Sequence, residues 1–169
     1  MSNPLTSEKV ILNLINEKAT RQFVAGQLTF AAPTVISDGV FNTSLVVSPA
    51  AGQPYTGTQT IKYTRLALAD APQGASTEFT LGSQASTSDV LADLVDRYGV
   101  LLTTEDIIVE ALPAADEFGA VSFNLRANGA SKLWIGQLAL VLKPVEVALN
   151  SVIPTDMDGL TITDVSTAP

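Results

Sequence analysis

The chain contains neither cysteine nor histidine. Without a thiol or an imidazole, Ser-His-Asp and Cys-His nucleophiles, disulfides and the usual zinc sites are all excluded. No Gly-x-x-x-x-Gly-Lys-Ser/Thr or Gly-x-Gly-x-x-Gly pattern occurs, so neither common phosphate-binding loop is present. We therefore predict a protein that is not an enzyme, with no catalytic, cofactor-binding or metal-binding residues. The absence of cysteine leaves the redox compartment open.

Charge is also scarce. Charged residues make up 15% of the chain, below the ~25% that is usual for a globular protein. The net charge of −8 would repel nucleic acid and anionic membranes, so we expect neither as a partner. The longest apolar stretch, Leu133 to Leu142, is interrupted by Gly136 and is far shorter than the ~20 residues of a spanning helix. The start of the chain carries no signal-peptide pattern. We expect a soluble protein whose thin charged shell is partly covered by protein partners.

The few charges are unevenly placed. Ten acidic residues between Asp70 and Glu117 are opposed only by Arg97, whereas the charges from Phe118 to Val145 are all basic: Arg126, Lys132 and Lys143. The two segments can pair within the fold or between neighbouring copies. A solvated acidic face is the simpler interpretation, and both stay open.

Two amphipathic helices are predicted. Val10, Ile11, Leu14 and Ile15 recur at helical spacing in a helix from about Ser7 to Lys18. A second apolar stripe begins at Val90 and ends at Tyr98. Ser86 and Asp89 fit a capping box in front of it, and Gly99 is placed to stop it.

Outside these two helices, the sequence predicts mainly β-strands. Segments rich in Thr, Val and aromatic residues, separated by Pro- and Gly-containing turns, predict strands at 27–30, 43–47, 58–68, 78–81, 107–111, 121–126, 132–142 and 160–163. The pair Thr103 and Asp106 suggests one helical turn at 104–107. The strand 132–142 is apolar on both faces, which favours a central place in its sheet. These patterns predict one α+β domain over residues 1–144, mostly antiparallel and arranged as a sandwich, with residues 145–169 as an extension or arm.

Three features deserve comparison with known kinds of site. Asp156 to Gly159 resembles part of a calcium loop, but Pro154 and the spacing to Asp164 do not fit it, so a plain turn is the simpler interpretation. Trp134 fits a core or interface anchor better than a sugar-stacking platform. Tyr55 and Tyr63 lie near or within a strand, and core or cross-strand packing is expected for Tyr63. A paired-carboxylate hydrolase stays formally open, although Asp89, Asp93 and Asp96 are expected on a solvated helix surface.

Several stretches, taken in order, resemble a family of virion structural proteins from large tailed bacteriophages. They are 3–6 with the helix at 10–15, the segments 55–58 and 63–66, and the run 93–107 containing Asp93-Leu94, Tyr98-Gly99-Val100, Leu102-Thr103 and Asp106-Ile107. The resemblance covers residues 1–112 and its motifs are turn, cap and strand residues, so it transfers no functional residue. The chain after Pro113 matches nothing in that family. The resemblance implies a repeated building block of a phage particle, assembled in the host cytoplasm.

We therefore expect a non-catalytic structural subunit of the head, neck or tail of a virion. It would act as a homo-oligomer and by contact with other virion proteins, without a cofactor. Trp134, the strand at 132–142 and the arm after Pro144 are the expected contacts. The alternative is a ligand-binding β-sandwich module of the carbohydrate-binding or adhesin-like kind, which requires an exposed cluster of aromatic side chains.

Overall fold

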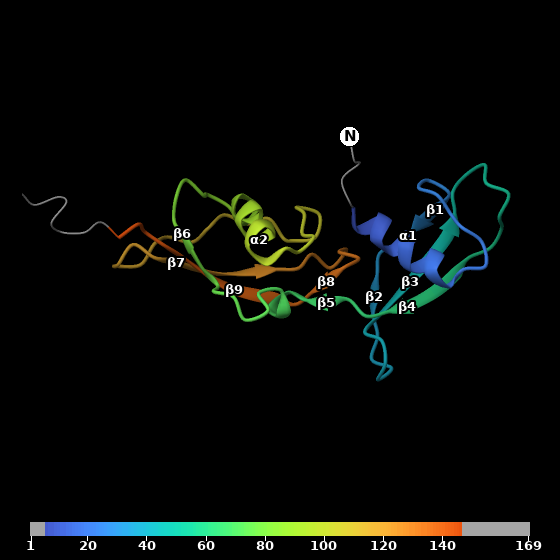
Figure 1. Cartoon of the computed structure of the whole chain (residues 1–169), viewed down its shortest axis with the longest axis horizontal. Coiled ribbons are helices and arrows are strands. Elements are labelled where there is room, and N and C mark those ends of the chain that lie inside the picture. Colours follow the sequence, from blue (N-terminus) through green and yellow to red (C-terminus); the bar gives the residue numbers. More distant parts are fainter. Residues whose placement is uncertain (1–5, 147–169) are drawn as a thin grey trace, which may run out of the picture.

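The structure is a computed structural model that describes residues 6–146, and its elements lie in two lobes along one long axis (Figure 1). The amino-terminal lobe, residues 6–65, contains α1 (Ser7–Lys18), β1 (Leu28–Phe30), β2 (Thr34–Val35), β3 (Thr43–Pro49) and β4 (Gln59–Tyr63). The carboxy-terminal lobe, residues 66–146, contains β5 (Leu66–Ala67), β6 (Glu78–Thr80), α2 (Leu91–Tyr98), β7 (Val121–Arg126), β8 (Trp134–Ile135) and β9 (Gln137–Lys143), with short 3-10 turns at Leu68–Asp70 and Thr87–Val90. The fold is α+β.

The amino-terminal lobe is one small antiparallel sheet with α1 on one face. β3 is its centre, pairing with β1 and β2 on one side and with β4 on the other. Alternate residues of β3 are buried, because one face of the strand lies under α1 and the other faces outward. Ile11 and Leu12 of α1 complete the small core that contains Leu45 and Val47. Thr6 caps α1, because its hydroxyl accepts a hydrogen bond from the Lys9 amide.

The carboxy-terminal lobe has the larger core. β9 lies between β6 and β7, parallel to the first and antiparallel to the second. α2 and its preceding turn cover this sheet, and their start shows the predicted Ser86–Asp89 capping box. Gly99 ends α2 in the left-handed conformation, as predicted. One apolar cluster fills the space and includes no residue of the amino-terminal lobe: Leu68, Ala71, Phe79, Val90, Leu91, Leu94, Leu102, Ile107, Val121, Leu125, Trp134, Leu138, Leu140 and Leu142.

The lobes meet beside a short two-stranded sheet of the carboxy-terminal lobe. β5 pairs in parallel with β8 directly after the chain leaves β4. Beside it, the Tyr63 hydroxyl donates to the Lys132 carbonyl at 2.8 Å, and the Lys132 ammonium lies 3.3 Å from Glu8 of α1. The loop 129–133 therefore connects the second lobe to both layers of the first.

Three predicted strands differ from the structure. The expected strand at 58–68 is two strands, because at Arg65 the backbone amide bonds to the Asn42 side chain instead of a neighbouring strand. The strand at 132–142 is interrupted by Gly136, which has φ +80°. The segment 107–111 makes only isolated bridges, to Ala127 and, through Ala111, to Ser86. The helical turn expected at 104–107 is a turn closed by the Asp106 amide on the Thr103 carbonyl.

The central place of β9 is confirmed, but the reason given for it was wrong. Its residues alternate between buried and exposed, so only one face of this strand lies in the core. A sandwich of two sheets stays a prediction, as does the division into a domain at 1–144 and an arm at 145–169. The strand expected at 160–163 lies outside the described residues.

Candidate functional site

An apolar groove runs between α1 and β4. In the register of the sheet, Ile61 lies beside Leu45, so both side chains are on the face that α1 covers. Leu45 is 1% exposed, but Ile61 is only half-buried, because α1 lies over β3 and leaves the β4 side partly open. Leu14 of α1, one turn after Ile11, is 44% exposed at this opening. Two hollows of about 330 and 530 Å³ share Ile15, Gln59 and Ile61 and so form one continuous groove.

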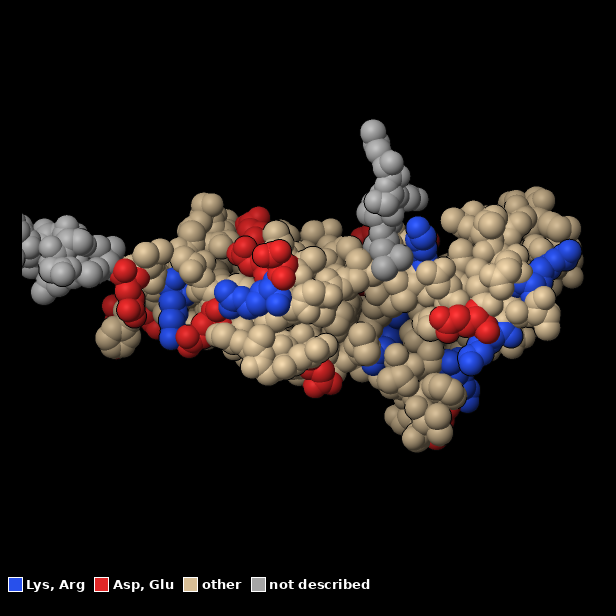
Figure 2. All heavy atoms as spheres, in the orientation of Figure 1, with Lys and Arg blue, Asp and Glu red and all other residues tan. Residues whose placement is uncertain are grey.

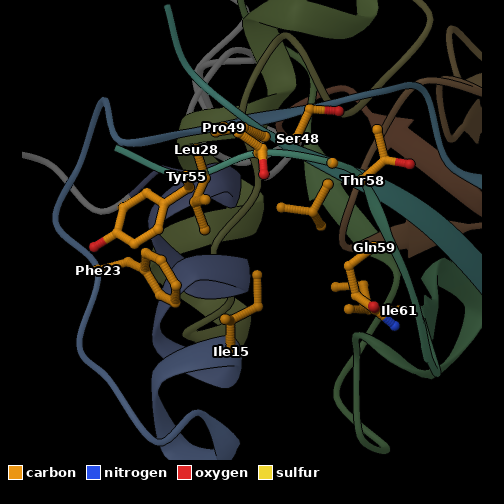
Figure 3. A pocket seen from close by; sticks show the side chains of 12 residues that line it. Ile15, Phe23, Leu28, Ser48, Pro49, Tyr55, Thr58, Gln59 and Ile61 are labelled. Atoms are coloured by element: carbon orange, nitrogen blue, oxygen red, sulfur yellow. The ribbon is translucent and has the colours of Figure 1, made fainter. Parts of the chain in front are cut away.

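The far end of the groove is closed by two aromatic rings (Figure 3). Phe23 and Tyr55 meet edge to face with ring centroids 5.4 Å apart. Asn16 holds this end in place, since its side chain bonds both the amide and the carbonyl of Phe23, at 2.8 and 2.9 Å. Leu28 and Pro49 line the groove beside Tyr55, and Thr58 and Gln59 contribute a hydroxyl and an amide on the side away from the two rings (Figure 3).

The outer edge of β4 is unpaired among the described residues, since β4 pairs with β3 alone. The Val46 carbonyl accepts a hydrogen bond from Ala31, so the backbone groups of Val46 point away from its β4 partner, Thr60. In an antiparallel pair of this kind, the backbone amide and carbonyl of each residue point away from the partner residue. The amide and carbonyl of Thr60 therefore face the open edge, and by the two-residue period so do those of Lys62. The Gln59 side chain donates to the Thr60 carbonyl at 3.2 Å.

A free strand edge next to an apolar groove is a site for an additional strand. The edge supplies unpaired hydrogen-bonding groups, and the groove accepts every second side chain of an incoming segment. Lys62 does not block the edge, because its side chain lies on the face away from α1 and pairs with Asp38 at 3.1 Å. The amides of Phe41 and Val40, and after them the bond to Lys62, hold the pKa of Asp38 below its usual range.

The acidic residues do not assemble into a metal site of three or more ligands within residues 6–146. No group of three acidic ligands is close enough there to hold a metal ion. Asp93 and Asp96 are exposed on α2, while Asp89 is used by the helix cap. The amides of Ala85 and Ser86, followed by the Ser86 hydroxyl, lower the pKa of Asp89 by stabilising its charged form. The structure thus gives these three carboxylates a capping or solvated role.

The residues expected as contacts have different positions. Trp134 is 3% exposed and donates from Nε1 to the Leu101 carbonyl at 2.8 Å, so it is a core residue. Tyr63 joins the lobes, and burial raises its pKa to about 12. Tyr55 lines the groove. The calcium-like segment 156–159 and nearly all of the predicted arm lie outside the described residues.

Sequence reasoning missed the groove and the edge. Of the predicted stripe of Val10, Ile11, Leu14 and Ile15, the structure buries Ile11, half-buries Val10 and Ile15, and leaves Leu14 44% exposed, so the prediction of one buried helix face holds only in part. The unpaired edge depends on strand order, which local sequence patterns do not specify. The one signal of the groove in the sequence was the width of the apolar stripe on α1.

Charge is separated between the lobes. Residues 6–65 contain five cations and three carboxylates, whereas residues 66–146 contain four cations and eleven carboxylates. The formal charges are therefore +2 and −7. On the face in Figure 2, acidic side chains are spread over the carboxy-terminal lobe, and basic ones are more frequent on the other lobe.

No helix within residues 6–146 is long and apolar enough to cross a membrane. No curated protein and no solved structure matches the chain. A family match covers residues 1–168, nearly the whole sequence, and the chain belongs to the family described as "Family of unknown function (DUF7941)".

Proposed function

We propose that this chain is a non-catalytic structural subunit of a tailed-phage virion, in the head, neck or tail. It acts by self-association and by contact with other virion proteins, and it is assembled in the host cytoplasm. The observation that carries the self-association is the open edge of β4 beside the groove under α1. The virion setting comes from the resemblance of residues 1–112.

The surface supports an assembly role in two ways. Exposed edges with adjoining apolar surface favour pairing with another chain, so a protein that retains one in solution gains from covering it. The +2 and −7 lobes give the molecule an electrostatic polarity that orients neighbouring copies.

Two measurements test the proposal. Light scattering of the full chain over a concentration series is expected to show species heavier than the 17.7 kDa monomer. Mass spectrometry of washed virions is expected to find the chain at the level of other structural proteins, with soluble host proteins as the depletion control. A strict monomer at every concentration contradicts self-association, and absence from washed virions contradicts the virion role.

A ligand-binding module remains the second candidate, and the Phe23–Tyr55 end of the groove favours it. The two rings pack against each other and leave an apolar hollow with a hydroxyl and an amide at its rim. Such a hollow suits a small, mainly apolar ligand or an apolar sugar face better than a charged one. Calorimetric titration with a panel of oligosaccharides, repeated with Tyr55→Ala, tests this candidate. Binding that is lost in the variant supports it, and absence of binding across the panel contradicts its carbohydrate form.

A further inference from the structure

We propose that the groove between α1 and β4 receives residues 147–169 of a second copy, with Leu160 to Thr163 adding a strand along the open edge of β4. This inference rests on the self-association proposed above and identifies the segment that carries it. Its basis is the match between the edge, the groove and the sequence of that segment.

The edge requires a segment with free backbone groups and strand-forming residues. The amide and carbonyl of Thr60 and of Lys62 point outward from β4. Leu160-Thr161-Ile162-Thr163 contains three β-branched residues in four positions, a composition that favours strands. The Gln59 side chain, now bonded to the Thr60 carbonyl at 3.2 Å, is displaced by the incoming amide. One surface hydrogen bond between uncharged groups is thus exchanged for another.

The groove requires apolar side chains at every second position. A strand added beside β4 directs alternate residues toward α1, into the space next to Leu14 and Ile15. With Leu160 and Ile162 on that side, both become covered, while Thr161 and Thr163 face the solvent. The opposite arrangement would bury two hydroxyls against Leu14. The alternation therefore fixes which face of the segment meets the groove.

Charge favours the first lobe of a neighbour over the segment's own second lobe. Residues 147–169 contain Asp156, Asp158 and Asp164 and no cation. They continue from a lobe with a formal charge of −7, whereas the groove belongs to the +2 lobe and has Lys18 in its lining. Like charges separated by about a Debye length repel measurably at low salt, and opposite charges attract.

Geometry leads to the same partner. After β9 the described chain ends at Glu146, at the end of the long axis farthest from α1 and β4 (Figure 1). A return to its own groove would take the acidic segment back along the whole acidic lobe. A neighbour whose amino-terminal lobe lies beyond that end presents its groove close to Glu146. Residues 147–169 have an extended length of about 75 Å, so they reach this groove with only a short part of that length. Head-to-tail exchange of this kind is heterologous and extends to rings or filaments.

Single substitutions in the full chain test the proposal. Leu14→Glu places a charge in the groove and Ile162→Glu places one in the incoming strand. Val95→Glu, at a residue of α2 that is 36% exposed, is the matched control in the other lobe. We expect the concentration at which assemblies dissociate, measured by light scattering, to rise at least tenfold in the first two variants and to stay unchanged in the control. Circular dichroism verifies that each variant is folded.

Cross-linking identifies the partner directly, because the natural chain has no cysteine. A tagged Thr60→Cys chain mixed with an untagged Thr161→Cys chain is expected to form a covalent heterodimer with a short bis-maleimide. Ser122→Cys, at an exposed position of β7, replaces Thr60→Cys in the control mixture and is expected to give no heterodimer. In a chain with both Thr60→Cys and Thr161→Cys, an internal cross-link at monomer mass would show that the segment folds back on its own groove, which overturns the proposal.

The outcomes separate this inference from the proposed function. Assemblies that persist unchanged in Leu14→Glu and Ile162→Glu overturn the inference and leave self-association standing. A wild-type chain that is monomeric at every concentration overturns both. Assemblies that weaken only in the two groove variants, together with the heterodimer, establish the exchange.

Discussion

Arg65 donates from Nη1 to the backbone carbonyl of Ser131 at 2.8 Å, joining the amino-terminal lobe to the loop that precedes β8. Arg65 as a whole is 3% exposed, and its guanidinium also donates from Nε to the Thr43 hydroxyl at 2.9 Å. Ser131 continues the connection, because its hydroxyl donates to the buried carboxylate of Asp106 at 2.7 Å. Burial lowers the pKa of Arg65, yet an arginine keeps its charge at neutral pH. A buried cation held by neutral oxygens thus connects the two lobes.

Replacing Arg65 with alanine is expected to destabilise the protein by about 2–4 kcal/mol, since hydrogen bonds from a charged group are lost and a cavity is left. Urea unfolding followed by circular dichroism measures the change. Arg21→Ala, at an exposed position, is the control and is expected to change stability by no more than about 0.5 kcal/mol. Equal unfolding free energies for Arg65→Ala and the wild type would show that this connection does not stabilise the fold.

Tyr63 is expected to titrate near pH 12 instead of its ordinary value of 10.0, because burial disfavours the phenolate. The folded state holds this proton more tightly than the unfolded state, so the contribution to stability is complete below about pH 10 and is lost as pH rises toward 12. Near-ultraviolet absorbance of tyrosinate follows the titration, and Tyr63→Phe is expected to remove the step near 12. An unchanged titration curve in that variant contradicts the assignment.

Gly136→Ala is expected to cost about 1–2 kcal/mol, because a side chain at φ +80° meets the backbone of its own residue. This position lets the chain change partners between β8, which pairs with β5, and β9, which pairs with β6 and β7. Gly129→Ala is the matched control: it lacks the positive φ and has no atom within 4 Å of an added Cβ. Thermal unfolding of both variants measures this cost. Equal melting temperatures for Gly136→Ala and Gly129→Ala would contradict the expected destabilisation at Gly136.

The elements that sequence predicted well are those whose signals are local. The Ser86–Asp89 capping box and the Gly99 stop each depend on a few neighbouring residues, and both are present. Strands in which apolar and polar residues alternate clearly, such as 121–126, were equally easy to predict from sequence. The α+β class follows from these elements together.

The features that sequence missed depend on distant partners. Thr58 to Leu68 has a uniform strand composition, but Arg65 divides it because its amide bonds to Asn42 and its side chain to a loop far along the chain. The candidate site was harder still to predict. It arises because α1 lies over β3 and leaves the groove beside β4 uncovered, and that offset is set by packing between elements, which periodicity does not describe.

Thr60→Pro is expected to abolish self-association while leaving the fold intact. The Thr60 amide points to the open edge and takes no part in the β3–β4 ladder, so proline removes a donor that only an incoming strand would use. Thr60→Val keeps the amide and a β-branched side chain and is the matched control. Light scattering is expected to show the proline variant as a monomer at concentrations where the wild type and the valine variant assemble. Because an edge proline also discourages any other strand from pairing there, a folded Thr60→Pro chain that assembles like the wild type would place the association surface away from β4.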